Sequence, residues 1–594
     1  MTPLNLALQT GNKEILNLLL NDERLTIGKC ALKNCQELTE FVIPFKLTFI
    51  GDSAFQQCSS LRKITIPSSV ESIGDSAFDG CSSLKELIIP SSVISINDWA
   101  FSNCSSITQV TIPSSVTKLG KEAFRSCSSL QNIVFLSQLT EICEYCFFGC
   151  SSLTKIELPS SVTIIRNYAF AECTSLQQIT IPPTVEIIEN SAFRSCTALK
   201  EIKIPTSLTT IEQNVFYDCQ SLKDVSIPPN ITKIEQFAFK KCTNLTTISI
   251  PSSVASFGKG TLSECHSLKK FSFPSSMTSV PEDFFEDCIS LKLIQIPETV
   301  VSIEKRSFIG CKALKKIIIP QSVTNINDES FGGCKSLKKI DIPTSINVLN
   351  SRLFMACYSL KEIDIPSSVT KINEYAFFHC TSLIKVTIPS SVTEISNDVF
   401  RECKSLKQII IPASVTIIDF GTFLDCSSLE KMEIPSSITS LMSSLFQGCI
   451  SLKEITIPSS VNKIGSCAFS CCESLKKVDL SPNIKFIPDC CFTKCKSLVQ
   501  ISIPSSVEFL GKQAFSRCSS LIDVSIPSSV KKIDEYCFWE CTSIKHITIP
   551  SSVIEIGKCA FSACTSLIEI RVPSSIEIKA EMIEKSENVK IIYY

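Results

Sequence analysis

A cysteine recurs every 23 residues along most of this chain, and this period constrains the fold more than any other feature. The series starts at Cys35 and ends at Cys564, which places 24 cysteines in phase without an insertion. A chain of 594 residues would ordinarily divide into several domains, because single cores stop growing at a few hundred residues. Stacked repeats escape this limit, since each repeat packs only against its neighbours.

Apolar residues fall at fixed offsets from each of these cysteines. Position +n denotes the nth residue after the cysteine, and the apolar offsets are +3, +6, +8, +12, +15, +19 and +20. In the repeat that starts at Cys58 they are occupied by Leu61, Ile64, Ile66, Val70, Ile73, Ala77 and Phe78. The +20 column runs from Phe55 to Phe561 and is interrupted only by Leu262. About eight inward side chains per coil stabilise it by roughly 12–24 kcal/mol, which the ordering of its backbone largely offsets. The repeats are therefore expected to fold only as an array.

The segment Leu61-x-x-Ile64-x-Ile66 alternates inward and outward residues, as a strand does, and matches the L-x-x-L-x-L signature of leucine-rich repeats. Proline follows at +9 in nearly every copy and ends the strand. We predict a leucine-rich-repeat solenoid whose strands form one long parallel sheet on the concave face. Short helical or irregular segments are expected on the opposite side, around Ala77 and Phe78.

The two ends of the chain depart from the repeat. Residues 1–27 contain Thr2-Pro3-Leu4-Asn5-Leu6-Ala7, which is similar to the start of an ankyrin repeat. This segment is either a helical cap or the remnant of a longer ankyrin array. The solenoid is predicted to occupy residues 28–575, and residues 576–594, which end in an apolar strand, are predicted to form a C-terminal cap.

The repeat resembles the BspA-like, or Treponema-pallidum-type, leucine-rich repeats. Its residues Ala77-Phe78, Cys81, Leu84 and Ile89-Pro90-Ser91-Ser92-Val93 match the pattern A-F-x-x-C-x-S-L-x-x-I-x-I-P-S-S-V. This resemblance covers about residues 28–575 and implies surface or secreted proteins that adhere to host proteins. It implies no enzymatic activity.

Composition excludes several classes of function. The formal net charge is −1, from 57 basic and 58 acidic residues, which argues against a nucleic-acid partner. No run approaches the ~20 apolar residues of a membrane span. The N-terminus lacks the basic region of a signal peptide, so the expected location is the cytoplasm or the cell surface by an unconventional route.

The 33 cysteines and three histidines invite chemical hypotheses. Side chains on adjacent parallel strands seldom reach the disulfide torsion, so we expect the in-phase thiols to stay reduced. Cys143 and Cys146 form the only C-x-x-C pair, whereas zinc sites usually need two. His379 lies beside Cys380, which belongs to the inward column. We therefore predict no catalytic residue, no metal and no cofactor. Two denser groups lie near the C-terminus, namely Cys467, Cys471 and Cys472, and Cys490, Cys491 and Cys495. The +18 members Cys467, Cys490 and Cys559 fall one residue before the core position, so some of these thiols are expected to be exposed and oxidisable.

The outward strand positions +4, +5 and +7 must carry any specificity, since their neighbours are committed to the core. In mid-chain they hold columns of lysine followed by acidic residues. The candidate partner-binding residues are Lys269, Lys270, Lys292, Lys315, Lys316, Lys338, Lys339, Asp341 and Asp364. Consecutive lysines at strand spacing repel one another unless an acidic group answers them. They indicate a docking patch for an acidic protein segment or glycan, or alternatively a solvated face that prevents aggregation.

The sequence thus predicts a non-enzymatic, monomeric protein-binding solenoid of the surface or adhesion type. Its expected partner is a protein, including a host or extracellular one. The alternative function is an intracellular scaffold in which the ankyrin-like start and the solenoid join two partners.

Overall fold

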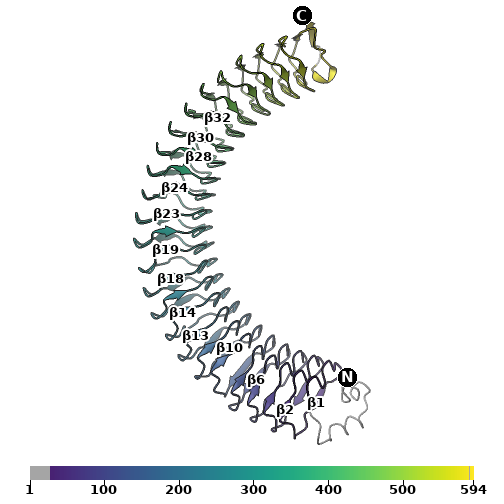
Figure 1. Cartoon of the computed structure of the whole chain (residues 1–594), viewed down its shortest axis with the longest axis vertical. Coiled ribbons are helices and arrows are strands. Elements are labelled where there is room, and N and C mark those ends of the chain that lie inside the picture. Colours follow the sequence, from purple (N-terminus) through teal and green to yellow (C-terminus); the bar gives the residue numbers. More distant parts are fainter. Residues whose placement is uncertain (1–26, 587–588) are drawn as a thin grey trace. The chain divides into compact units, whose positions relative to one another are not determined.

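The computed structural model describes residues 27–586 and 589–594, which fold into two compact units. The first unit runs to Met277 and includes Pro281–Leu291, and the second comprises Thr278–Val280 and Lys292–Tyr594. Each unit is a stack of coils that repeat in register (Figure 1). The predicted leucine-rich-repeat solenoid is confirmed, with about 24 turns of 23 residues and parallel strands.

The first set of strands falls where the alternating pattern predicted it, around +5 to +7. Only the middle residue of a typical strand points into the core, as Ile64 does between Lys63 and Thr65. These strands are β1 Glu40–Val42, β3 Lys63–Thr65, β6 Gln109–Ile112, β8 Asn132–Phe135, β10 Lys155–Glu157, β12 Gln178–Thr180, β15 Asp224–Ser226, β17 Thr247–Ser249, β20 Leu293–Gln295, β22 Lys316–Ile318, β25 Glu362–Asp364, β27 Lys385–Thr387, β29 Gln408–Ile409, β31 Lys431–Met432, β33 Glu454–Thr456, β35 Lys477–Asp479, β37 Gln500–Ser502, β39 Asp523–Ser525, β41 His546–Thr548 and β43 Glu569–Val572.

A second set of strands at +14 and +15 was not foreseen from the sequence. The residue at +15 is almost always buried, so a single apolar position signals each of these strands. They are β2 Phe49–Ile50, β4 Ser72–Ile73, β5 Ser95–Ile96, β7 Lys118–Leu119, β9 Glu141–Ile142, β11 Ile164–Ile165, β13 Ile187–Ile188, β14 Thr210–Ile211, β16 Lys233–Ile234, β18 Ser256–Phe257, β19 Ser279–Val280, β21 Ser302–Ile303, β23 Asn325–Ile326, β24 Val348–Leu349, β26 Lys371–Ile372, β28 Glu394–Ile395, β30 Ile417–Ile418, β32 Ser440–Leu441, β34 Lys463–Ile464, β36 Phe486–Ile487, β38 Phe509–Leu510, β40 Lys532–Ile533 and β42 Glu555–Ile556.

The strands pair with the same positions one coil away but form many short sheets in place of one long one. Strand β10 pairs with β12 in parallel, with Ile156 opposite Ile179, and each sheet contains two to four strands. Each coil contributes only two to four residues to a ladder before the proline at +9 or the turn ends it. Because the ladders are so short, the loss of one hydrogen bond is enough to end a sheet. The 23-residue register nevertheless continues.

The segment between +16 and +22 is an irregular turn, so of the two predicted conformations the irregular one is observed. Its residues at +18 and +22 have a left-handed backbone, with φ of 54° at Ser76 and 77° at Gly80. The N–H groups of Ser76, Phe78 and Gly80 donate to carbonyl groups of the next coil, each at 2.8 Å. Those of Ala77, Asp79 and Cys81 donate to residues three positions earlier. A left-handed residue prevents helical continuation, and the alternating donors link each coil to the next.

Two side-chain columns fill the core beside this turn. The Phe rings stack on their neighbours, with centroids 5.5 Å apart between Phe354 and Phe377 and 5.4 Å between Phe377 and Phe400. Thiols of the in-phase cysteines donate to the backbone carbonyl 26 residues earlier, as Cys380 does to Phe354 at 3.1 Å. Cysteine therefore suits this column because it is small, apolar and still able to donate a weak hydrogen bond.

Serine at +11 has an equally specific function. The Ser69 hydroxyl donates to the Leu47 carbonyl at 2.7 Å, and Ser460 donates to Ile438 at 2.7 Å in the same way. The acceptor is the +12 carbonyl of the preceding coil. The hydroxyl thus satisfies a backbone group that the turn after the proline leaves without a strand partner.

The residues after Pro573 cover the last coil. Strand β44 Lys590–Tyr593 pairs in parallel with β43, and the Tyr594 hydroxyl donates to the Ile549 carbonyl at 2.8 Å. A short 3-10 helix, Ala580–Met582, lies beside the turn and buries Met582. Carbonyl groups of Glu581, Met582 and Glu584 accept the N–H groups of Cys559, Phe561 and Ala563. The ankyrin-like start predicted for residues 1–27 lies outside the described residues except for Ile27.

Replacing an alanine at a left-handed position by glycine should stabilise the fold. Ala356 has a φ of 57°, whereas Ala376 is fully buried and has no such backbone. We expect Ala356→Gly to stabilise its coil by about 0.5–1 kcal/mol, because relief of the left-handed backbone exceeds the added freedom of the unfolded chain. The matched variant Ala376→Gly should destabilise by about 1 kcal/mol. Amide hydrogen exchange of each coil measures both effects, and destabilisation by Ala356→Gly would contradict the assignment.

Candidate functional site

The strand face of the second unit carries the candidate partner-binding lysines. Lys292 and Lys315 occupy +4 in consecutive coils, and the Lys315 N–H donates to the Lys292 carbonyl at 2.9 Å. Lys338 and Lys361 follow at +4 in the next two coils, joined by a backbone hydrogen bond of 3.3 Å. Lys316 and Lys339 lie beside them at +5. We call Lys292, Lys315, Lys316, Lys338, Lys339 and Lys361 the lysine ladder; all six are exposed.

The remaining candidate residues are also exposed. Asp341 and Asp364 occupy +7 in the second unit, and the Asp341 side chain is 92% exposed. Lys269 and Lys270 lie on the strand face of the first unit. Lys361 was missing from the predicted set, although it continues the +4 column and could have been found by extending that column one coil further.

The ladder contains lysines that form no ion pair with a carboxylate of the described residues. Among the described residues Lys292, Lys315, Lys316 and Lys338 have no acidic oxygen within 4.0 Å, and Lys339 has only Asp341 at 3.8 Å. Further along the same column Lys453 contacts Glu430 of the preceding coil at 2.8 Å. This hydrogen bond lowers the pKa of the Glu430 carboxyl. In the +4 column, positive and negative residues therefore alternate where ion pairs form. In the lysine ladder every +4 residue is positive.

Shallow grooves accompany the strand face. One of about 460 Å³ lies over β31, β33 and β35 and is lined by Lys431, Glu454 and Lys477 together with Glu433 and Asp479. A second, of about 280 Å³, lies beside Ile410, whose side chain is 79% exposed. Ion pairs within the first groove, such as Lys477–Asp479 at 3.1 Å, neutralise much of its charge. These grooves were not foreseen, because alternating charges along a strand are also typical of a solvated face.

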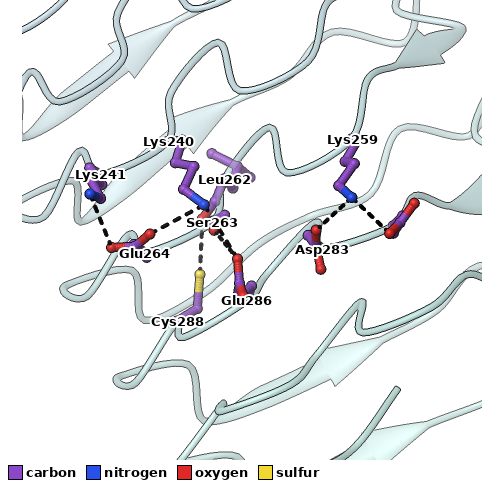
Figure 2. Close-up of polar contacts among 10 residues, drawn as sticks. Lys240, Lys241, Lys259, Leu262, Ser263, Glu264, Asp283, Glu286 and Cys288 are labelled. Atoms are coloured by element: carbon purple, nitrogen blue, oxygen red, sulfur yellow. Dashed lines mark hydrogen bonds and ion pairs between the residues drawn. The ribbon is translucent and has the colours of Figure 1, made fainter. Parts of the chain in front are cut away.

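A second cluster of charges surrounds the coil in the first unit that lacks a column phenylalanine (Figure 2). Lys240 lies between Glu264 at 3.2 Å and Glu286 at 3.4 Å, and Ser263 donates to Glu286 at 2.9 Å. Only 19% of the Lys240 side chain is exposed. Every lysine in this cluster contacts a carboxylate, so it stabilises an irregular coil and presents no unanswered charge.

The irregular coil also replaces stacked rings with edge-to-face ones. Leu262 occupies the +20 position and is buried, and its carbonyl accepts the Cys288 thiol at 3.2 Å (Figure 2). Nearby, Phe284 and Phe285 contact each other at 4.6 Å with rings at 90°, and Phe271 contacts both. Phe271 and Phe284 are thus additional to the column and pack against Phe285, the first column ring after Leu262.

His379 and the neighbouring Cys380 thiol have different partners. Burial raises the pKa of the Cys150 and Cys196 thiols to about 12, so they stay protonated at neutral pH. The His379 ring lies 3.6 Å from a Glu402 carboxylate oxygen, whereas the Cys380 thiol donates into the core. Over residues 27–586 and 589–594, no group of three or more His, Cys, Asp or Glu side chains could hold a metal ion. The same residues include no helix long and apolar enough to span a membrane.

A comparison with known protein families shows which family the repeats belong to. The BspA type leucine rich repeat region matches the chain in six overlapping copies, at residues 11–129, 48–177, 163–292, 278–407, 393–522 and 485–594. This chain belongs to the BspA-type leucine-rich repeat family. The predicted resemblance is therefore confirmed for the repeats. No ankyrin repeat is shown, and the first BspA-type match already begins at residue 11.

The chain is also similar to several solved structures. A leucine-rich repeat protein from Bacteroides ovatus is 31% identical over 63% of this chain and 92% of its own, with a TM-score of 0.51. A leucine rich cell surface protein from Faecalibacterium prausnitzii is 26% identical over 56% of this chain and 87% of its own, with a TM-score of 0.37. A leucine rich repeat protein from T. pallidum is 26% identical over 39% of this chain and 78% of its own, with a TM-score of 0.20. No curated protein matches the chain.

Alkylation of the native protein should separate the cysteines of the BspA-type coils into two classes. Cys30, Cys143, Cys467, Cys471 and Cys490 are partly exposed, whereas the other 28 cysteines are buried. We expect iodoacetamide in mildly alkaline buffer to label those five, more slowly at Cys143 and Cys467, where burial raises the thiol pKa to about 11. It should spare the buried column until denaturant is added, because a thiol reacts as an accessible thiolate. Peptide mass spectrometry reads the result, and labelling of column cysteines in the native protein would contradict the burial.

Replacing one ladder lysine by glutamate should reduce the repulsion within the column. Lys315 lies between Lys292 and Lys338, so Lys315→Glu should raise the unfolding midpoint at low salt and lose this effect at high salt. The matched variant Glu430→Lys should lower the midpoint, because it breaks the contact with Lys453. Thermal unfolding at two ionic strengths measures both. An increase that persists at high salt would show that charge is not the cause.

Proposed function

We propose that this protein is a non-enzymatic binding solenoid that captures a protein partner through an acidic segment docked on the lysine ladder. The observation that carries this proposal is the +4 column of the second unit. There Lys292, Lys315, Lys338 and Lys361 repeat in four consecutive coils, and none of the four has an acidic oxygen of the described residues within 4.0 Å. Membership in a family of leucine-rich repeats supports binding over catalysis.

Electrostatics favours an acidic ligand at this position. Neighbouring strands lie about 4.8 Å apart, a distance at which like charges destabilise each other. An acidic segment that runs across the coils would place carboxylates against successive ammonium groups and remove this repulsion. Elsewhere in the same unit the chain removes it internally, as in the Lys453–Glu430 and Lys531–Glu508 pairs. An external carboxylate would therefore relieve more electrostatic repulsion at the ladder than at these paired positions.

The neighbouring acidic residues would restrict how a partner lies on the face. Asp341 and Asp364 occupy +7 in the coils of Lys338 and Lys361, and Glu362 occupies +5. An acidic segment would be attracted along +4 and repelled from +7. Such asymmetry sets the register and orientation of a partner more than its affinity.

The remaining chemistry of the chain supports binding without catalysis. The nucleophiles of the repeat are column thiols that burial holds in the protonated form, as at Cys150. The histidine nearest to one of them, His379, is adjacent to a glutamate instead. On the family resemblance we place the partner among proteins, host or extracellular proteins included.

Charge reversal on the ladder should abolish binding of an acidic polymer. The test compares the full chain with a triple variant that carries Lys292→Glu, Lys315→Glu and Lys338→Glu. A control variant carries Lys305→Glu, Lys312→Glu and Lys335→Glu, which alter the net charge equally in neighbouring exposed positions away from the +4 column. The probe is fluorescent poly-L-glutamate, followed by anisotropy at two salt concentrations.

We expect the wild-type and control proteins to bind the probe with an affinity that falls as salt rises. The ladder variant should bind at least about tenfold more weakly, since three attractive contacts become repulsive. Equal losses in the two variants would show that net charge, and not the ladder, governs binding. Binding that no variant changes would overturn the proposal.

A further inference from the structure

Two partly exposed cysteines occupy the same position of consecutive coils near the C-terminal end of the second unit. Cys467 and Cys490 both lie at +18, the left-handed position of the turn, with φ of 59° and 54°. The turn ladder fixes their register, because the Cys467 N–H donates to the carbonyl of Asp489 at 3.0 Å. Elsewhere the +18 column holds other residue types or a cysteine without a cysteine neighbour, as at Cys559. The coincidence of two adjacent thiols is therefore confined to this pair.

Side chains at +18 in adjacent coils stand side by side. Tyr145 and Tyr168 occupy this position in the first unit, and their rings stack with centroids 4.8 Å apart and planes 3° from parallel. Backbone hydrogen bonds join adjacent coils at this turn, and hydrogen-bonded neighbouring segments lie about 4.8 Å apart, which is within the Cα range of about 4.4–6.8 Å over which disulfides form. Burial raises the pKa of the Cys467 thiol, and the nearby Cys490 thiol raises it further.

These thiols differ from those of the buried column in their freedom to move. A column thiol such as that of Cys472 is fully buried and donates to a backbone carbonyl, at 3.1 Å from Phe446. Cys490 instead makes a long contact of 3.6 Å to the Gln513 side-chain oxygen, and both Cys467 and Cys490 are partly exposed. Rotation about the Cα–Cβ bond can thus bring the two sulfur atoms together, and a small reagent can reach them.

We propose that Cys467 and Cys490 form an oxidisable dithiol site that a small disulfide, such as oxidised glutathione, converts into a disulfide bridge between two coils. One thiolate attacks a sulfur of the reagent and expels one molecule of reduced glutathione. The second thiolate attacks the protein sulfur of this mixed disulfide and expels another. Two protein thiols lose two electrons and two protons, and the reagent disulfide is reduced to two thiols.

The bridge links two nearest-neighbour coils and closes a ring that extends from Cys467 to Cys490. In a stack where each coil contacts only its neighbours, such a link opposes local separation of these two coils. Burial raises the pKa of the Cys467 thiol to about 11, so the exchange is slow at neutral pH and faster in alkaline buffer. Oxidation should therefore slow amide hydrogen exchange in the turns that contain the two cysteines.

The test treats the reduced full chain with oxidised glutathione at pH 8, followed by alkylation, trypsin digestion and fragment mass spectrometry. The expected product joins peptide 464–476 to peptide 486–494 through Cys467 and Cys490, and reductant reverses it. Cys471→Ser is the matched control, because Cys471 is also partly exposed and left-handed, with a φ of 61°, but has no cysteine at +22 in the adjacent coils. This variant should form the same bridge.

Cys467→Ser and Cys490→Ser should lose the bridge and retain glutathione on the remaining thiol. The wild-type chain is informative even if a variant fails to fold. Glutathione held separately on both thiols without a bridge would overturn the proposal, as would a bridge through Cys471 or a failure of both thiols to react.

Discussion

The whole structure depends on backbone hydrogen bonds that join each residue to nearly the same position one coil away. Strand pairs such as β10 with β12 and the turn donors at +18, +20 and +22 all impose this translation. The 23-residue register cannot slip, because a shift of one residue would turn the buried face of every strand outward. Each side chain consequently lies beside its own counterpart, and the identity of that counterpart decides whether the contact stabilises the fold.

Stacking of like on like is favourable for some residue types and unfavourable for others. Phenylalanine gains ring contacts, as between Phe377 and Phe400, and serine at +11 gains a carbonyl acceptor from the preceding coil. Lysine gains nothing from a second lysine, and at several positions it contacts an acidic residue one coil away, as Lys453 contacts Glu430. A column of lysines therefore destabilises the fold, and the fold does not need it for packing. This distinguishes the ladder from the other columns.

The sequence could predict the columns but not the backbone that positions them. Burial follows from a pattern of apolar residues, so the inward set, the first strands and the solenoid class were all predictable from offsets. The second strands were missed because each contributes only one buried residue, such as Ile73, which carries no alternation. The left-handed turn was missed because Ser, Glu, Tyr and Cys all occur at +18 and only some copies have the glycine that signals such a backbone.

The same limit applies to the candidate site. Column offsets identified the lysines, yet whether a lysine finds a carboxylate depends on side-chain conformations across coils. Lys339 and Asp341 share a strand and lie 3.8 Å apart, whereas Lys316 has no acidic neighbour within 4.0 Å among the described residues. The environment of a cysteine also depends on its position in the coil. At the start of the coil the thiol is fixed by a carbonyl in the core, whereas Cys467 at +18 is partly exposed and in register with Cys490 of the next coil. A function built on this scaffold must therefore be sought where repetition of a residue brings no packing gain, because only there does the fold leave the side chain free for another molecule.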